Sequence, residues 1–386
     1  MKDLSVIIVS YNVKYYLEQC LNAVQAAQGS LDVEIFVVDN NSSDASINYL
    51  HPRFPDVQFI ANTENWGFSH ANNQAIRQAS GRYILLLNPD TIVTEHTLTD
   101  CIAYLDQHPE VGAAGVAMYD WRGNFAWESR RGIPTPWTSF CKMTGLSTLF
   151  PHSRRFGHYY MRYLPRTEAN YIEIISGAFL MMRREAVRQV GLLDETFFMY
   201  GEDIDLSYRF LLDGWFNAYI PTPILHYKGE STQKSSYRYV HVFYEAMLIF
   251  FNKHFSHRYR LLSLFIRMAV YLRAAIDLLP RFWKRLFAFL PKRRPEPETC
   301  LCFGSEQALR EMEDICQRNG LKFLSSPCSV KPLYTVYDTG SYTYAQILDR
   351  LIAEAEQGHP TALGTYDPHT GQMILPNDVF HYLTGP

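Results

Sequence analysis

The chain has 386 residues, 47% of them hydrophobic and 15% aromatic, and a formal net charge of −3, so it is not a disordered protein and should form two or three folded units. Seven scattered cysteines make no CxxC pair, no window of ~20 residues lacks charge, and the start runs straight into a strand-like segment. We therefore expect no disulfide framework, no conventional transmembrane helix, no signal peptide, and a cytoplasmic location.

The first 115 residues alternate between short β-rich runs and helical stretches. The expected strands are 4–10, 33–38, 57–61, 82–87 and 111–116. The expected helices are 15–27, 69–79 and 95–107. This alternation predicts a mostly parallel α/β sheet, whose ligands bind at the carboxyl ends of the strands. The polar loops 10–12, 39–44 and 88–90 each follow a strand and should converge on one crevice.

Residues 120–170 are rich in aromatic residues and Arg and are expected to form loops near the site. A strand is expected over 172–183 and a short helix over 203–212. The region 240–290 reads as helical, basic and apolar, and 291–298 as a linker rich in Pro and charge. These features divide the chain into a first domain at 1–255, a basic amphipathic segment with its linker at 256–298, and a small α/β domain at 299–386.

Four positions along the first domain carry polar groups suited to chemistry. Asp39 ends an apolar strand and could accept hydrogen bonds from a base or ribose, although a cluster of helix-capping residues is an equally simple interpretation. Asn88-Pro89-Asp90 also ends a strand, and its acid could bind Mg²⁺ or Mn²⁺ beside a diphosphate. The alternative for this tripeptide is an ordinary turn.

The segment Glu202-Asp203-Ile-Asp205 opens a helix, where the helix dipole favours ionised carboxylates. An ionised carboxylate facing a crevice can act as a general base, whereas helix capping alone is the alternative. Asp205 lies four residues before Arg209 and is expected to pair with it in a structural role. His226 follows a strand-like run and could complete a metal site, although a lone His is more often structural.

In order, six motifs make the chain resemble the family-2 glycosyltransferases with the GT-A fold over roughly residues 3–255, closest to the branch that contains bacterial rhamnosyltransferases. The motifs are Val6-Ile-Ile-Val-Ser-Tyr-Asn12, Val37-Val-Asp-Asn-Asn-Ser-Ser-Asp44, Asn65-Trp-Gly-Phe68 with Ala71-Asn-Asn73, Leu86-Leu-Asn-Pro-Asp-Thr91, Ser176-Gly-Ala178 and Gly201-Glu-Asp-Ile-Asp205.

The resemblance implies roles for individual residues. Those expected to bind the donor are Ser10, Tyr11, Asn12, Asp39, Asn65, Gly67, Asn88 and Asp90. Asp90 matches the last acid of the family's metal motif, whereas Asn88 replaces its first acid and lowers the negative charge there. Asp203 matches the catalytic base, with Glu202 beside it, and His226 matches a metal ligand of some relatives.

The resemblance further implies an inverting transfer dependent on Mg²⁺ or Mn²⁺, in cell-surface polysaccharide synthesis. dTDP-rhamnose is the favoured donor, a UDP-hexose is the alternative, and a saccharide or lipid-linked molecule is the acceptor; no nucleic acid partner is expected. A non-catalytic nucleotide-sugar binding protein would not need Glu202 and Asp203. A sugar nucleotidyltransferase should carry a Gly-rich loop after the first strand, which Ser10-Tyr11-Asn12 is not.

Two further expectations concern the remainder of the chain. From 253 to 294 eleven Lys or Arg face one acid, a balance of +10 that leaves about −13 for the rest. Residues 258–290 place this charge opposite an apolar face, which predicts peripheral attachment to the inner face of an anionic membrane; packing on protein is the alternative. Within 299–386 four cysteines lack the spacing of a common zinc site and are expected to be buried thiols.

Overall fold

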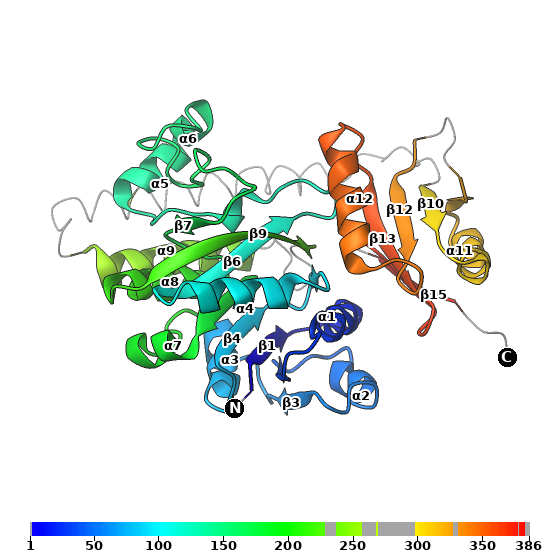
Figure 1. Ribbon diagram of the computed structural model, residues 1–386, viewed down its shortest axis with the longest axis horizontal. Helices are drawn as coiled ribbons and strands as arrows, with labels where there is room; N and C mark the ends of the chain where they lie inside the picture. Colours follow the sequence, from blue (N-terminus) through cyan, green and yellow to red (C-terminus); the bar gives the residue numbers. More distant parts are fainter. Residues whose placement is uncertain are drawn as a thin grey trace.

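The computed structural model of the chain describes residues 2–227, 237–256, 268, 298–326, 331–376 and 378–382, with side chains of the 237–256 segment from residue 241 onward. It contains one nine-stranded sheet and one six-stranded sheet, flanked by helices (Figure 1). The predicted amphipathic helices at 258–290 lie outside the described residues except for Met268, and most of the linker also lies outside them.

The large sheet and its helices occupy the part of the chain before residue 255. Its strands are β1 Leu4–Ser10, β2 Val33–Asp39, β3 Gln58–Ala61, β4 Tyr83–Leu87, β5 Thr91–Val93, β6 Val111–Tyr119, β7 Asn170–Ile172, β8 Phe179–Arg183 and β9 Phe216–His226. The helices are α1 Lys14–Ala27, α2 Ser46–Leu50, α3 Phe68–Ile76, α4 Thr97–Gln107, α5 Pro136–Met143, α6 Leu146–Leu149, α7 Arg184–Val190, α8 Glu202–Leu212 and α9 Tyr237–His254, with a 3₁₀ turn at Trp127–Ser129.

The strand order is β3-β2-β1-β4-β8-β6-β9-β5, with β7 paired to β9. β1 is parallel to β2 and β4, and β6 is parallel to β9, whereas β8, β5 and β7 run the other way. The chain therefore leaves β1 toward β2 on one side and toward β4 on the other, which opens a crevice at their carboxyl ends.

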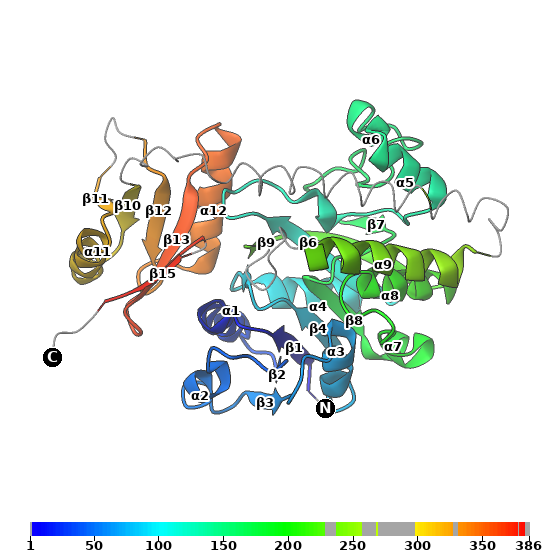
Figure 2. The same cartoon turned by 180° about the vertical axis from the view of Figure 1, so that it is seen from behind.

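β1 shows why the sheet is covered on both faces. Leu4, Val6 and Ile8 pack into the core that contains α1, and Ile7 and Val9 pack into the core that contains α3. Alternate side chains of a strand point to opposite faces, so a continuous apolar run must be buried on both sides. Figure 2 shows the opposite side of the sheet with α3, α7, α8 and α9.

Three expectations about elements are wrong. Residues 120–170, expected to form loops, contain the helices α5 and α6 and the 3₁₀ turn at Trp127–Ser129. The segment 172–183 is two strands, β7 and β8, separated by a loop that reaches the site. The strand β9 is longer than expected, since the sequence predicts only a strand-like run directly before His226. Pro221 and Pro223 interrupt the pattern of strand-forming residues in this segment. Its register against β6 shifts at this point, from Val116 opposite Ile220 to Ala117 opposite Pro223, so the prolines lie where regular pairing breaks.

The second sheet forms a small α/β unit at the carboxy-terminal end, as expected. Its strands are β10 Thr299–Phe303, β11 Lys322–Leu324, β12 Tyr334–Asp338, β13 Ala362–Asp367, β14 Gln372–Leu375 and β15 Asp378–His381, and its helices are α11 Glu306–Arg318 and α12 Tyr344–Glu356. Its order is β11-β10-β12-β13-β14-β15. Cys300, Cys302 and Cys316 are buried free thiols, whereas Cys328 lies outside the described residues.

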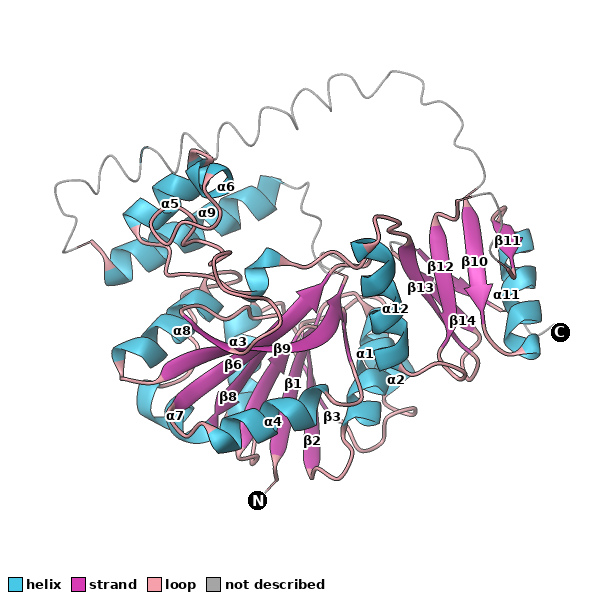
Figure 3. Ribbon diagram, turned by 45° about the horizontal axis from the view of Figure 1, so that its top comes forward, coloured by secondary structure: helices cyan, strands magenta, loops and turns pink. Residues whose placement is uncertain are grey.

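This unit packs on the large sheet through α12, which lies between the small sheet and α1 (Figure 3). Ile347, Leu348 and Leu351 of α12 belong to the same apolar core as α1. The Leu363 N–H donates to Trp121 O at 2.7 Å, and the Tyr16 hydroxyl donates to Leu375 O at 3.2 Å. The contact is therefore a shared core with polar links, directly behind the helix that follows β1.

Glu95 is expected to secure this contact, because its carboxylate accepts from the Tyr344 N–H at 2.8 Å and the Ala345 N–H at 3.0 Å, at the start of α12. Glu95→Ala should remove about 1–2 kcal/mol, as loss of a helix N-cap does, and speed amide exchange across α12 roughly tenfold. Glu306→Ala, an exposed acid in the first turn of α11, is the matched control. Equal exchange in the two variants would show that Glu95 does not secure the unit.

Candidate active site

The carboxyl ends of β1, β2 and β4 bring three of the predicted loops to one edge of the sheet. Ser10 lies opposite Asp39, and Ile8 lies opposite Leu87, the residue before Asn88. Convergence follows from the parallel pairing, because strands that run in the same direction end at the same edge. The three loops therefore meet at one edge of the sheet.

The loops after β1 and β2 hold each other through Asn12. Asn12 has a positive φ of 55°, and its side-chain oxygen accepts from the Ser43 N–H at 2.7 Å. Asp39 Oδ2 accepts from the Ser42 N–H at 2.8 Å, whereas Asp39 Oδ1 and Ser10 Oγ are buried with no hydrogen-bond partner in the described structure. Buried polar atoms without partners are costly, so these two are suited to a polar ligand. Tyr11 follows them and is 40% exposed.

Gly67 joins this edge to the loop before α8. Its φ is 84°, its N–H donates to Asn65 Oδ1 at 3.0 Å, and its carbonyl accepts from the Asn40 side chain at 3.1 Å. A Cβ at this position would lie 2.5 Å from the carbonyl oxygen of Phe198. Glycine is therefore required here both by conformation and by space.

Asn88, Asp90 and His226 form one group, because the short strand β5 pairs with the end of β9. Thr91 lies opposite His226, and His226 Nε2 is 3.3 Å from Asp90 Oδ1 and 3.4 Å from the Asn88 amide. Asp90 is 2% exposed. The structure thus brings together three residues that lie up to 138 positions apart in sequence.

This group can accommodate a divalent cation. Two ligand atoms at right angles on an octahedral ion with bonds of about 2.1 Å lie about 3 Å apart, close to the Asp90–His226 separation. The Asp90 carboxylate and the Asn88 amide oxygen are ligand types that suit Mg²⁺ or Mn²⁺, whereas the His226 imidazole is a ligand type more usual for Zn²⁺. In the described ranges no group of three or more His, Cys, Asp or Glu side chains could hold a metal, so the remaining ligands would come from Asn88 and from the substrate.

Asp203 lies in the first turn of α8, and its carboxylate has several partners. Oδ2 accepts from Arg131 Nη2 at 2.5 Å and from the Gly177 N–H at 3.0 Å, and Oδ1 accepts from the Ile204 N–H at 2.8 Å. Ala178 follows Gly177 in the same loop, and its carbonyl accepts a hydrogen bond from the Asn88 N–H at 3.0 Å. The loop 176–178 therefore links the base candidate directly to the metal-site candidate.

Glu202 differs strongly from its neighbour. It is 6% exposed, and burial followed by the charge of Asp203 raises its pKa from 4.5 to about 8. A carboxyl that keeps its proton at neutral pH cannot accept another, so Glu202 is not suited to the role of a base. Asp203 is therefore the better candidate for a base, and Glu202 is a neutral neighbour.

Glu202→Gln should raise thermal stability, most clearly at alkaline pH. Because the folded-state pKa lies above the unfolded one, the folded state binds the proton more tightly, and stability is lost as pH rises from about 4.5 through about 8. The amide removes this titration. Melting temperatures from pH 5 to pH 9 should diverge, with wild type falling below Glu202→Gln above pH 7. Parallel curves would mean that Glu202 does not hold a proton.

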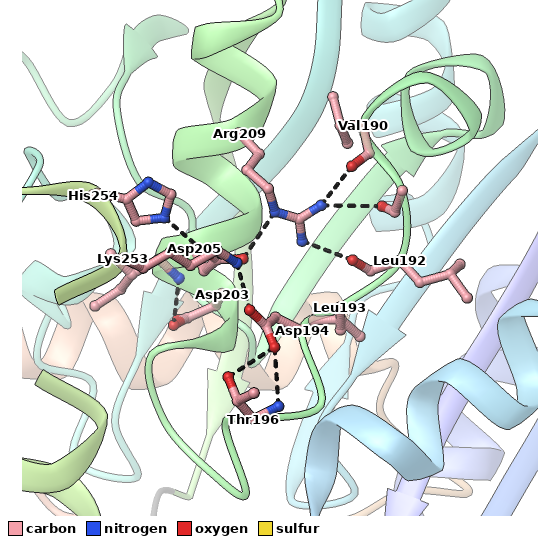
Figure 4. A network of polar contacts seen from close by, with 12 residues as sticks. Val190, Leu192, Leu193, Asp194, Thr196, Asp203, Asp205, Arg209, Lys253 and His254 are labelled. Atoms are coloured by element: carbon pink, nitrogen blue, oxygen red, sulfur yellow. Dashed lines mark hydrogen bonds and ion pairs between the residues drawn. The ribbon is translucent and has the colours of Figure 1, made fainter. Parts of the chain in front are cut away.

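Asp205 fixes α8 in place, as Figure 4 shows. It pairs with Arg209 at 2.8 Å as predicted, and also accepts from His254 at 2.7 Å and contacts Lys253 at 2.8 Å. Burial alone would raise its pKa, but hydrogen bonds from His254 and Lys253 hold the pKa at about 2. Asp205 therefore ties α8 to α9. Arg209 donates to the carbonyls of Val190 and Leu192, which ties α8 to the end of α7 and to the loop that follows α7.

Arg131 is the functional candidate that sequence reasoning missed. It lies in the Arg-rich region 120–170, which was expected to lie near the site, but nothing in its local pattern indicates a pairing with Asp203, 72 positions away. The adjacent Arg130 is fully buried and donates to the carbonyls of Leu164 and Pro165. The sequence alone therefore does not show that Arg131 contacts the candidate base whereas Arg130 contacts only backbone carbonyls.

Comparison with known proteins places these features in a family. Residues 5–191 match the model of Glycosyl transferase family 2. An N-acetylglucosaminyl-diphospho-decaprenol L-rhamnosyltransferase of Mycobacterium tuberculosis is 26% identical over 276 residues, which cover 64% of this chain and 83% of that protein. A hexosyltransferase of low-salt glycan biosynthesis, Agl10 of Haloferax volcanii, is 26% identical over 215 residues, 54% of this chain and 62% of that protein.

Among solved structures, a mannosyltransferase from Pyrobaculum calidifontis in complex with GDP-Man and Mn²⁺ is similar with a TM-score of 0.46 and 16% identity. The match covers 76% of this chain and 79% of that one.

Proposed function

We propose that this chain transfers rhamnose from dTDP-rhamnose to a lipid-linked saccharide, with inversion at the anomeric carbon. The match of residues 5–191 to the model of Glycosyl transferase family 2 and the similarity to glycosyltransferases support this proposal. The observation that carries the proposal is the chain of contacts from Asn88 through the loop 176–178 to Asp203. It sets a candidate leaving-group site and a candidate base on opposite sides of one short loop.

In the proposed mechanism the edge of β1 and β2 binds the nucleoside. Two buried atoms lack hydrogen-bond partners in the described structure, Asp39 Oδ1 and Ser10 Oγ. The carboxylate oxygen of Asp39 accepts a hydrogen bond from the base or ribose, and the Ser10 hydroxyl can accept one or donate one. The loop at Asn65 and Gly67 lies against the donor, since its backbone is already held by Asn40. These contacts orient the sugar toward α8.

Asn88, Asp90 and His226 lie where the diphosphate would leave. A divalent ion bound there would supply positive charge next to the leaving group. Asp90 and His226 would hold it, and the β5–β9 pairing keeps these two residues together. Asn88, which stands at the first acid position of the family's metal motif, still offers an oxygen but makes this group less negative, which should weaken binding of the ion.

Asp203 accepts the proton of the acceptor hydroxyl as that oxygen attacks the anomeric carbon. Arg131 and the Gly177 N–H hold the carboxylate in position. The new bond from the acceptor oxygen forms as the bond from the anomeric carbon to the diphosphate oxygen breaks on the opposite face, so this single displacement inverts the anomeric centre and releases the nucleoside diphosphate. Glu202, which keeps its proton, does not compete for the role of base.

We also propose the three-part division at 1–255, 256–298 and 299–386, and peripheral attachment to the inner face of the cytoplasmic membrane. Within the ranges that the structure describes, no helix is long and apolar enough to cross a bilayer. The membrane proposal therefore concerns attachment to one leaflet, in keeping with a lipid-linked acceptor.

Incubation with a panel of donors tests the proposal. We expect nucleoside diphosphate release from dTDP-rhamnose, accelerated by a polyprenyl-diphosphate-linked GlcNAc acceptor, abolished by EDTA and restored by Mn²⁺. Turnover of a UDP-hexose in place of dTDP-rhamnose would change the proposed donor and leave the proposed acceptor, metal dependence and inversion unchanged. Release from no donor, with acceptor and Mn²⁺ present, would contradict the proposal.

A further inference from the structure

A cluster of exposed aromatic and aliphatic side chains lies on the hairpin of α5 and α6. Trp137, Phe140, Leu149 and Phe150 are 44%, 50%, 70% and 46% exposed. The aromatic rings lie side by side. The ring centre of Trp137 is 5.8 Å from that of Phe140 and 6.1 Å from that of Phe156, and the ring centre of Phe150 is 5.5 Å from that of Phe156. We call these five residues the hairpin patch. Figure 1 shows α5 and α6 standing clear of both sheets.

The sequence around the hairpin patch carries charge of one sign only. From 132 to 167 there are five Lys or Arg and no Asp or Glu. Arg154 and Arg155 are exposed, and the Arg155 guanidinium lies 5.7 Å from the ring centres of Trp137 and Phe156. Cations set around exposed aromatic rings suit the polar–apolar boundary of an anionic bilayer, where each side chain meets its preferred surroundings.

The hairpin is anchored beside the proposed base. Arg131, which pairs with Asp203, directly precedes it, and the Gly132 N–H donates to Tyr159 O at 3.1 Å. Glu173 accepts from the Ile133 N–H at 2.6 Å and lies 2.9 Å from His158, so both arms of the hairpin are fixed to the strand region. The patch therefore keeps a defined position relative to Asp203.

From these observations we propose that the hairpin patch docks the enzyme on an anionic lipid bilayer and so presents Asp203 to an acceptor that is anchored there. The inference rests on the proposed lipid-linked acceptor. It assigns a surface distinct from 258–290. Exposed aromatic side chains and the positive charge of Arg154 and Arg155 act together, so binding should need anionic lipid and weaken with salt.

Flotation with vesicles of phosphatidylcholine and phosphatidylglycerol tests the surface in the full chain. Phe140→Ser with Leu149→Ser, and separately Arg154→Gln with Arg155→Gln, should each lower the bound fraction at least tenfold in 0.1 M salt. Tyr171→Ser with Phe216→Ser is the matched control, because these two stacked side chains are 48% and 46% exposed and do not belong to the hairpin patch. All variants should keep wild-type turnover of a water-soluble acceptor.

Tryptophan quenching by brominated acyl chains gives a second readout that does not depend on other membrane contacts. Trp137→Phe should lose a distinct part of the quenching seen in wild type, whereas Trp66→Phe, which removes a tryptophan of 50% exposure beside the donor loop, should not. Unchanged flotation and unchanged quenching in the hairpin variants would overturn the inference while leaving the proposed transfer intact. Loss of self-association in those variants, with no loss of flotation, would instead identify the patch as a contact between copies.

Discussion

Asp203→Asn should abolish sugar transfer while leaving the fold and the donor affinity in place. The amide is nearly the same size as the carboxylate, and its oxygen can still accept from Arg131 and from the Gly177 N–H, so the loop 176–178 stays in position. The amide cannot accept the proton of the attacking hydroxyl. General base catalysis contributes typically ~10²–10⁴ in rate, and kcat should fall by about that factor.

The measurement is single-turnover transfer with saturating donor, alongside calorimetric affinity for the nucleoside diphosphate. Asp213→Asn, at the exposed carboxyl end of the same helix, is the control and should behave as wild type. Glu202→Gln should keep substantial activity, because the side chain it replaces is already neutral at pH 7. A kcat of Asp203→Asn within threefold of wild type would remove Asp203 from the mechanism.

Asp90→Ala should remove the metal dependence of donor binding. Asp90 lies 3.3 Å from His226 and is the only carboxylate at this group in the described part of the chain, so its loss leaves an imidazole and an amide as ligands. Removing a group that stabilises charge in the transition state costs ~10²–10³ in rate, and kcat/KM should fall by at least the lower figure. Calorimetry of the nucleoside diphosphate with and without Mn²⁺ measures the binding component.

Asn88→Asp is the opposite variant. It places an acid at the first acid position of the family's metal motif, so it should tighten Mn²⁺-dependent binding, whereas Asp90→Ala weakens it. If Mn²⁺ dependence stays the same in both variants, Asn88-Pro89-Asp90 is a turn and the metal is held elsewhere or not used.

The part of the site that could be predicted depends on short-range pattern. Continuous apolar runs at 4–10, 33–38 and 82–87 identify buried parallel strands, and parallel strands end at one edge, so the meeting of Ser10, Asp39 and Asn88 follows from the sequence. The pairing of Asp205 with Arg209 follows from helical spacing in the same way.

What could not be predicted depends on tertiary contacts. Residues 172–183 read as one strand because Ser176 and Gly177 interrupt the apolar run only briefly, yet the Gly177 N–H turns to Asp203 instead of a neighbouring strand. Arg131 reaches Asp203 from a region without periodicity, and Lys253 and His254 reach Asp205 from α9. No local sequence pattern predicts these partners, because each pair forms only when two elements that are distant in sequence pack against each other.

A single displacement at the anomeric carbon, with Asp203 as the base, should move the sugar. Proton NMR of the product that wild type forms from dTDP-β-L-rhamnose and a lipid-linked GlcNAc acceptor tests both parts of this mechanism. We expect an α-linked rhamnosyl product from wild type and no detectable product from Asp203→Asn over the same time. A β-linked product, which would mean retention, or equal product from Asp203→Asn, would contradict it.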